Sequence, residues 1–410
     1  MAQRRTITIL TLTALTIVGS ACSNSSSATP TASHRHIPPT TTAPLTTTST
    51  TAAPSVTPTT IQAPVRQAPG WTQSLTTLPP GGGFTSLSCI SDTFCVAAGG
   101  GTDGSGTELS SGSGVAVSWD GATWSQPSVY YPAPASGAVS APILPAIACT
   151  AGPSCVIVDA SGHTSTGDGT NWSAPSPVGP APTLPANPAD PGAGHLASRT
   201  VAVACAAPAS CAAVGNTGTA TVLKNGVWLP PQAFGAAAGL ASSVALYQAG
   251  RVGIACPSPS SCTAVVGTAV LNWNGATWSK EVGPWTTSLA PGAVQPTAIG
   301  CPTVNLCAIV NGTGLSARTT GRSWSAKQTI DPGGGLDAIT CPTATFCMAA
   351  DAGGSVMTWN GGTWSAPQPV LPAATQYTDI GTSLSCSSAQ FCMMMNADGD
   401  YATFTGQTPG

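Results

Sequence analysis

The chain of 410 residues is poor in charge: Asp, Glu, Lys and Arg make up 6% of it, against roughly 25% in an average soluble domain, and the formal net charge is −3. It has no cluster of Lys and Arg to attract a phosphate backbone, so nucleic acid is excluded as an expected partner. Its 47 glycines and 38 prolines are typical of short strands joined by many turns.

The first 21 residues have the three parts of an export signal. Arg4 and Arg5 supply positive charge, residues 6–18 are apolar, and Gly19-Ser20-Ala21 is a small-residue cleavage site. Because the apolar stretch is too short to cross a bilayer, it predicts a cleaved signal peptide and not a membrane anchor. We therefore expect residues 1–21 to be removed and the mature protein to be extracytoplasmic.

Cys22 follows the cleavage site directly. The stretch from Val18 to Cys22 resembles the lipobox of bacterial, actinobacterial-type lipoproteins, with Gly19 where that motif has an aliphatic residue. The alternative is ordinary cleavage after Ala21, which would leave Cys22 as a lone exported thiol and the protein secreted. The cysteine count favours lipidation, because the other 14 cysteines pair among themselves. We expect a lipid anchor at the outer face of the cell membrane.

Residues 22–69 consist mainly of Thr, Ser, Pro and Ala. Such a segment has too little apolar surface to offset the entropy of ordering it, which predicts a disordered stalk that acts as a spacer. The rest of the chain, residues 70–410, has a different, repeating pattern.

Seven pairs of cysteines six positions apart mark seven repeats. Two positions before each first cysteine stands an aliphatic residue, and the positions on either side of it are always Gly, Ala, Ser or Thr. This alternation predicts a strand with one face crowded against its neighbours. The pairs are Cys89/Cys95, Cys149/Cys155, Cys205/Cys211, Cys256/Cys262, Cys301/Cys307, Cys341/Cys347 and Cys386/Cys392.

Each repeat predicts four strands, and the last two form a hairpin such as the one from Trp119 to Trp124, in which Asp-Gly or Asn-Gly supplies the turn. The seventh repeat ends without its outer-strand tryptophan, whereas Trp71 stands unused before the first cysteine pair. The sequence therefore predicts an all-β fold: a seven-bladed β-propeller of four-stranded antiparallel blades, with an N-terminal strand that completes the last blade.

The cysteines admit two interpretations. Metal binding would favour histidines among closely spaced cysteines, but residues 70–410 hold only His163 and His195. An exported chain favours disulfides, so we expect seven local bridges, no metal and no cofactor.

One rim of the predicted ring carries links of very different lengths, and insertions on one face of a repeat protein usually mark its binding face. Sparse charges and aromatic residues outside the repeated positions fall at this variable-loop face. They could hold a sugar, a carboxylate or a protein segment; the alternative is that the arginines cap local carbonyls or form surface ion pairs of little energetic value. The candidate ligand-binding residues are Arg199, Arg251, Asp337, Asp379, Trp285, Tyr247, Tyr377 and His195.

The segment from Ser165 to Trp172 resembles the Asp-box turn of sialidase-like propellers, with its Asp and Gly offset by one place. The resemblance implies the propeller fold, and it places these turns opposite the family's active site. The family's Phe/Tyr-Arg-Ile-Pro signature is absent, and Glu108 and Glu281 are the only glutamates of the repeats, so no catalytic residue is assigned.

The sequence therefore favours a monomeric, surface-exposed, lipid-anchored module that binds a glycan or a protein at the cell surface through the variable-loop face, and it leans away from an enzyme. Two alternatives stay open: a degenerate or divergent sialidase-like glycosidase or lyase, and a structural component of the cell envelope.

Overall fold

In the computed structural model, the described residues all belong to the unit Gln62–Gly410. They form strands and turns, and none of them forms a helix with the length and apolar character required to span a membrane. The structure describes residues 68–74, 78, 82–101, 113–132, 145–159, 162–178, 201–215, 218–234, 252–267, 269–285, 296–320, 323–375 and 381–406.

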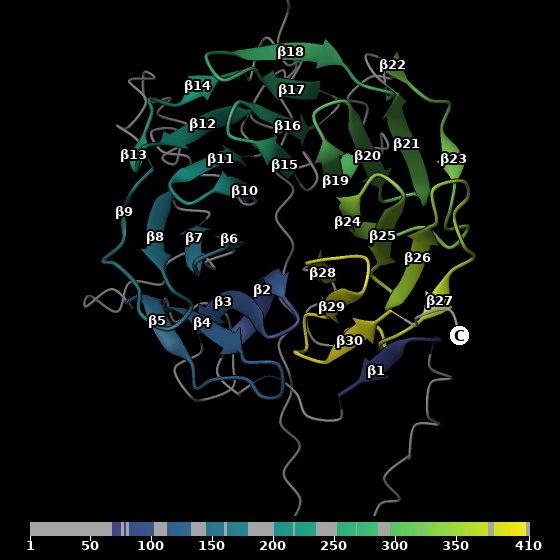
Figure 1. The fold of residues 1–410 in the computed structure, drawn as a ribbon, viewed down its shortest axis with the longest axis horizontal. Coiled ribbons are helices and arrows are strands. Elements are labelled where there is room, and N and C mark those ends of the chain that lie inside the picture. Colours follow the sequence, from purple (N-terminus) through teal and green to yellow (C-terminus); the bar gives the residue numbers. More distant parts are fainter. Residues whose placement is uncertain are drawn as a thin grey trace, which may run out of the picture. The chain divides into compact units, whose positions relative to one another are not determined.

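Seven antiparallel sheets surround a common axis, which confirms the seven-bladed β-propeller (Figure 1). Within a blade, successive strands lie farther from the axis, and the blades are numbered 1 to 7 in the chain order of their inner strands. The inner strands are β2 (Gly82–Ser91), β6 (Ala146–Thr150), β10 (Val201–Ala207), β15 (Gly253–Ser258), β19 (Pro296–Thr303), β24 (Leu336–Thr343) and β28 (Ser383–Cys386). The second strands are β3 (Phe94–Gly101), β7 (Ser154–Val158), β11 (Ser210–Gly215), β16 (Ser261–Val266), β20 (Leu306–Asn311), β25 (Phe346–Asp351) and β29 (Phe391–Met395).

The two outer positions of each blade are less regular. The third strands are β4 (Ser113–Trp119), β8 (His163–Gly167), β12 (Thr219–Lys224), β17 (Ala269–Trp273), β21 (Leu315–Thr320), β26 (Ser355–Trp359) and β30 (Tyr401–Thr405). The outermost strands are β5 (Ser128–Tyr131), β9 (Ser176–Pro177), β13 (Val227–Trp228) with β14 (Gln232–Ala233), β18 (Trp278–Val282), β22 (Ser323–Trp324) with β23 (Gln328–Thr329), β27 (Gln368–Pro369) and, for the last blade, β1 (Trp71–Gln73).

Most outermost strands are interrupted just after their tryptophan. In blade 1, Trp124 pairs with Trp119, and the hydroxyl of Ser125 then accepts the N–H of Ser118 at 3.0 Å before pairing resumes in β5. Serines at the same place in blades 2, 5 and 6 do the same. Blades 4 and 7 are the exceptions, because β18 pairs with β17, and β1 with β30, without a break. The sequence predicted the strand but not its interruption.

Strand β1 completes the last blade, as the sequence predicted. It pairs antiparallel with β30, so that Trp71 lies opposite Phe404, and the two ring centroids are 5.6 Å apart. In Figure 1 this N-terminal strand lies beside the C-terminal strand at the edge of blade 7. The pairing joins the two ends of the repeat array and leaves no unpaired outer edge on β30.

The hydrophobic core consists of seven layers, one between each pair of neighbouring blades. The aliphatic residue of each inner strand points toward the preceding blade. Leu87, for example, packs with Met393 and Tyr401 of blade 7. The repeated tryptophans belong to the same layers, so no blade buries its apolar surface alone.

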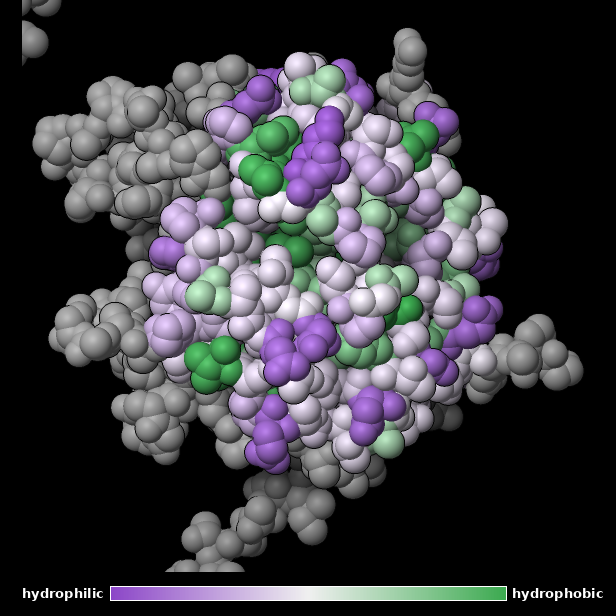
Figure 2. All heavy atoms as spheres, turned by 60° about the vertical axis from the view of Figure 1, so that its left-hand side comes forward, coloured by the Kyte–Doolittle hydropathy of each residue, from purple (hydrophilic) through white to green (hydrophobic). Residues whose placement is uncertain are grey.

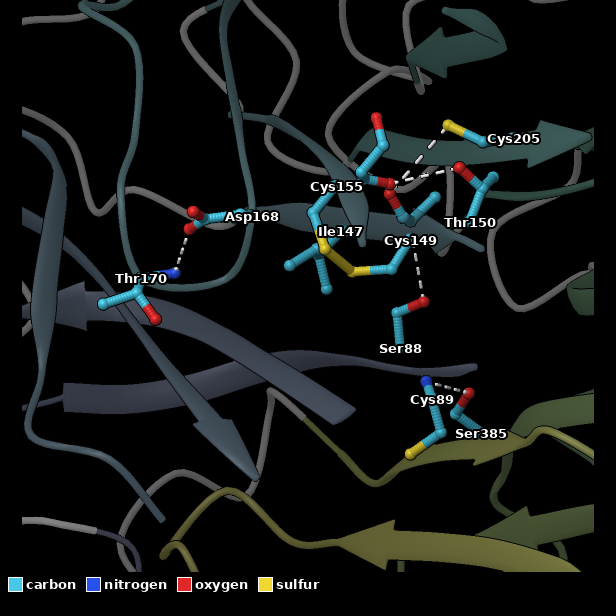
Figure 3. The surroundings of a disulfide bond; sticks show 12 residues. Ser88, Cys89, Ile147, Cys149, Thr150, Cys155, Asp168, Thr170, Cys205 and Ser385 are labelled. Atoms are coloured by element: carbon cyan, nitrogen blue, oxygen red, sulfur yellow. Dashed lines mark hydrogen bonds between the residues drawn. A yellow bond between two sulfur atoms is a disulfide. The ribbon is translucent and has the colours of Figure 1, made fainter. Parts of the chain in front are cut away.

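All seven predicted cysteine pairs form disulfides between the inner and second strands of one blade. Figure 3 shows the bridge between Cys149 and Cys155 at the end of β6. In blades 3 and 7 the bridges join Cys205 to Cys211 and Cys386 to Cys392.

The structure places the second cysteine of the pair deeper than a bridge across a rim turn would suggest. Cys211 is 2% exposed, and four further second cysteines are fully buried: Cys95, Cys155, Cys347 and Cys392. The reason is that these residues lie in the second strand and face a neighbouring blade; Cys211 packs with Val158 of blade 2, and Cys392 with Met348 of blade 6. They are therefore core residues of the layers between blades, and they offer no surface to a ligand.

The closure by β1 predicts a difference between two deletions. Removal of residues 23–66 keeps β1 and should leave the melting temperature unchanged within about 2 °C. Removal of residues 23–75 takes away Trp71 and exposes the edge of β30, so the melting temperature should fall by at least about 5 °C. Thermal unfolding of both proteins measures this, and equal melting temperatures would show that β1 does not hold the ring.

Candidate functional site

A cavity of 410 Å³, here called the channel, lies on the axis of the ring where the inner strands begin. The same three positions of every blade line it, at or just before the inner strand: the aliphatic residue that precedes the cysteine by two, and the two residues before it. In blade 1 these are Thr85, Ser86 and Leu87. Each blade has four antiparallel strand positions, so the chain is back at the same rim before every new blade. All seven inner strands therefore begin at one rim, here called the loop rim. They end at the opposite rim, here called the turn rim, which carries the cysteine turns.

Small polar side chains of the inner strands form hydrogen bonds between neighbouring blades around the channel. The hydroxyl of Ser86 accepts the N–H of Ile147 at 3.0 Å. The hydroxyl of Ser88 accepts the N–H of Cys149 at 2.9 Å, and that of Ser385 of the last blade accepts the N–H of Cys89 at 2.9 Å (Figure 3). These N–H groups lie on the inner edge of their sheets, where no further strand follows. The serines thus satisfy donors that would otherwise be buried without a partner.

Asp337 is the one charged residue among the described residues that line the channel. Its Oδ2 accepts the N–H of Thr382 at 3.1 Å, which links the inner strands of blades 6 and 7 at the loop rim. At the equivalent place in blade 5, the Thr297 hydroxyl donates to the carbonyl of Leu336 at 2.7 Å. Asp337 is therefore at the predicted mouth, and it also holds neighbouring blades together.

The structure places Trp285 differently from the expectation. Its side chain is 3% exposed and packs between blades 4 and 5 against Val265, Ile299 and Ile309, so it offers no ring to a surface ligand. A large apolar side chain directly after an outer strand reaches the neighbouring layer more readily than it stays in solvent. The remaining candidates, Arg199, Arg251, Asp379, Tyr247, Tyr377 and His195, lie outside the described residues.

The turn rim carries the Asp-box-like turns. In blade 2, Asp168 Oδ1 accepts the N–H groups of Asn171 and Thr170 at 2.7 and 2.9 Å, and the side-chain amide of Asn171 donates to Oδ2 at 3.0 Å. The bonds from Asn171 and then from Thr170 lower the pKa of Asp168 to about 2. Gly169 adopts a φ of 96°, which a side chain would strain. The turn is a local structural device.

The lowered pKa of Asp168 predicts that its carboxylate makes a small contribution to the stability of the folded protein, which is lost in acid. Its folded pKa lies below the unfolded value, so its stabilisation is present above about pH 4 and is lost as the pH falls through 2. Because the carboxylate is exposed, the effect should stay below about 1 kcal/mol. Asp168→Asn keeps the turn acceptors, as Asn274 does in blade 4, and should remove this pH dependence in unfolding measured from pH 5 to 2. An unchanged profile would contradict the assignment.

Other acidic and basic groups do not form a reactive cluster in the described part of the chain. There, no group of three or more His, Cys, Asp or Glu side chains could hold a metal ion. His163 Nδ1 lies 3.6 Å from the buried Asp159, at a turn of blade 2. Among the polar contacts that the sequence analysis missed are the inter-blade bonds of Ser86, Ser88 and Thr297. The preference for small residues was the only signal for these three.

Comparison with known proteins supports the fold. No protein-family model matches the chain, and no curated protein matches it. Solved structures do match. A structure described as YCF48 bound to D1 peptide covers 84% of this chain and 99% of its own, with a TM-score of 0.52 and 14% identity.

Two further structures give the same result. YCF48 from Cyanidioschyzon merolae covers 82% of this chain and 98% of its own, with a TM-score of 0.51 and 16% identity. The WD40 β-propeller domain of Doa1 covers 83% and 99%, with a TM-score of 0.52 and 10% identity. At these identities the likeness concerns the propeller fold, which is consistent with an interaction module.

Proposed function

We propose that this protein is a protein-interaction module that takes up a peptide segment of its partner at the loop rim of the channel. In this account the signal peptide of residues 1–21 is removed, Cys22 carries the lipid anchor, and residues 22–69 space the propeller from the outer face of the membrane. Of the two ligand classes that the sequence left open, a glycan and a protein, this proposal chooses the protein.

The channel mouth is the observation that carries the proposal. The first lining positions of the blades combine apolar side chains, such as Val201 and Val252, with hydroxyls at Thr85 and Thr297 and the carboxylate of Asp337. A preformed cavity of 410 Å³ whose lining is about equally apolar and polar has the size of a ligand site and offers both apolar contact and hydrogen bonds. One peptide side chain could enter the channel while the flanking backbone meets the polar groups.

Two further points favour a peptide. One propeller of similar fold is described as bound to a peptide, which makes this use of the architecture a reasonable model for the present chain. The chain also has few charged residues, 6% of its length, and on the face drawn in Figure 2 hydrophilic residues are scattered among residues of intermediate hydropathy. Recognition by shape and hydrogen bonds suits such a surface better than recognition by a charged patch.

A pair of matched substitutions in blade 3 tests the site. Val201→Trp should plug the channel mouth and weaken binding of peptides selected on the full-length protein from a random display library by at least tenfold, because no room remains for a side chain. Val227→Trp places the same ring on the turn rim, where Val227 is 64% exposed, and should leave affinity unchanged. Melting temperatures of both variants control for folding.

Three results would overturn the proposal: peptides that bind both variants equally well, no selectable peptide, or a saccharide panel that binds where peptides do not. Binding measured by titration calorimetry distinguishes them.

The anchor has its own test. Cys22→Ala removes the acceptor of the lipid, so the protein should move from the membrane fraction to the medium, whereas the protein lacking residues 23–66 should stay on the membrane. Fractionation and mass spectrometry of the mature N-terminus measure this. An unmodified Cys22 in the wild-type protein, or an unchanged distribution of the variant, would remove the lipid anchor.

A further inference from the structure

A second hollow, of 460 Å³, lies between blades 4 and 5 on the side of the turn rim, away from the channel. It is bounded by β16, β17 and β18 of blade 4 and by the cysteine turn and the outer hairpin of blade 5. Its polar lining includes Thr263, Asn272, Glu281 and Thr319, and the indole of Trp324 adds aromatic surface.

The pocket exists because blade 5 departs from the repeat. Thr319 stands where three other blades place a tryptophan (Trp119, Trp273 and Trp359), each packed against the tryptophan of its outer strand at 5.6–5.8 Å between centroids. The Thr319 hydroxyl instead accepts the N–H of Cys307 at 2.7 Å. Blade 2 also lacks that tryptophan, but there the ring of Trp172 lies directly over Gly167 and fills the space.

Blade 4 supplies an ordered polar wall to this pocket. The Thr263 hydroxyl donates to Asn272 Oδ1 at 3.0 Å, and Asn272 Nδ2 donates to Glu281 Oε2 at 2.7 Å. Both ends of the amide are engaged, so the carboxylate of Glu281 is held in place. No ion pair involves Glu281 within the described part of the chain, and Oε1 has no hydrogen-bond donor there.

Glu281 is also exceptional among the blades. In the register of the sheets Glu281 takes the place of Ser128 in blade 1: each lies opposite the third-strand residue that precedes the tryptophan by three. In blade 1 that serine accepts the indole N–H of Trp172 from the next blade at 3.1 Å. The other blades with a described partner at this place have uncharged residues: Ser176, Gln232, Gln328 and Gln368.

We propose that this inter-blade pocket is a binding site for a cationic side chain, the guanidinium of arginine or the ammonium of lysine, from a partner segment. A half-buried carboxylate with one oxygen already fixed forms strong charge-assisted bonds with such groups. The aromatic ring of Trp324 on the wall favours a cation further, most of all a planar guanidinium. The volume is at the lower end of that of ligand pockets, which suits one side chain and its adjacent backbone.

Small amides of single amino acids test the pocket on the full-length protein. N-acetyl-arginine amide and N-acetyl-lysine amide should bind with a dissociation constant of about 1 mM, whereas N-acetyl-citrulline amide, a neutral isostere of the arginine probe, should bind at least tenfold more weakly. Chemical-shift changes of the Trp324 indole and the Asn272 amide would place the binding. Equal binding of the citrulline and arginine probes would overturn the proposal.

Two variants of pocket residues and one control variant test the assignment. Glu281→Gln keeps an acceptor for Asn272 but removes the charge, and should weaken the arginine probe at least tenfold. Asp92→Asn, the same loss of charge at an exposed turn of blade 1, should not. Thr319→Trp restores the repeat tryptophan and should fill the pocket, abolishing binding without lowering the melting temperature.

Peptide binding at the loop rim should be unaffected by Glu281→Gln, so failure of either site is seen independently of the other. If Thr319→Trp does not fold, the Glu281→Gln comparison alone decides. Unchanged probe binding in Glu281→Gln would show that the pocket does not select for charge.

Discussion

The close approach of the seven inner strands around the axis is the constraint from which the rest of the structure follows. A Cβ atom added to Gly253 would lie 3.0 Å from the Cα of Ala298 in the next blade, and one added to Gly300 would lie 3.1 Å from the N of Cys341. At these two glycines even a methyl group is tight, and the matching positions of the other blades hold only Gly, Ala, Ser or Thr. Where serine is present, its hydroxyl also satisfies an N–H on the inner edge of the neighbouring sheet.

Because of this constraint, some positions of a blade accept few residue types and others accept many. The inner strands must keep small residues toward the next blade and an aliphatic residue toward the preceding one, so they carry the fold. Chemistry can enter only where the constraint is weak. Asp337 stands at the entrance of the channel, and Glu281 and Thr319 stand far from the axis, in the outer half of the layer between blades 4 and 5. Departures from the repeat are therefore the places to look for function.

Much of the fold could be predicted because it depends on short-range pattern. The spacing of the cysteines, the aliphatic residue two before each first cysteine, and the unmatched Trp71 predicted the blades, the disulfides and the closure. The break after Trp124 was missed because a serine hydroxyl replaces a backbone acceptor there, and this hydrogen bond can be seen only in the folded structure. Trp285 was misplaced because burial of one side chain after a strand depends on the neighbouring blade.

The candidate sites were less accessible to sequence reasoning. The position of Asp337 at the channel mouth could be read from its register, whereas its bond to Thr382 was not foreseen. The pocket of Glu281 could be recognised only by comparing blade 5 with the other blades in the structure. In the sequence Thr319 has no distinguishing feature; in the structure it stands where other blades have a tryptophan, and the missing ring leaves the pocket.

Hydrogen exchange at the inner edges tests the central constraint most directly. The amides of Ile147 and Cys149 have serine hydroxyls of blade 1 as their acceptors, so they should exchange as slowly as amides within the sheets. Ser86→Ala and Ser88→Ala should each speed exchange at the matching amide by at least tenfold and leave other strands unchanged. Exchange of these two amides in the wild-type protein as fast as that of exposed turns would contradict the account.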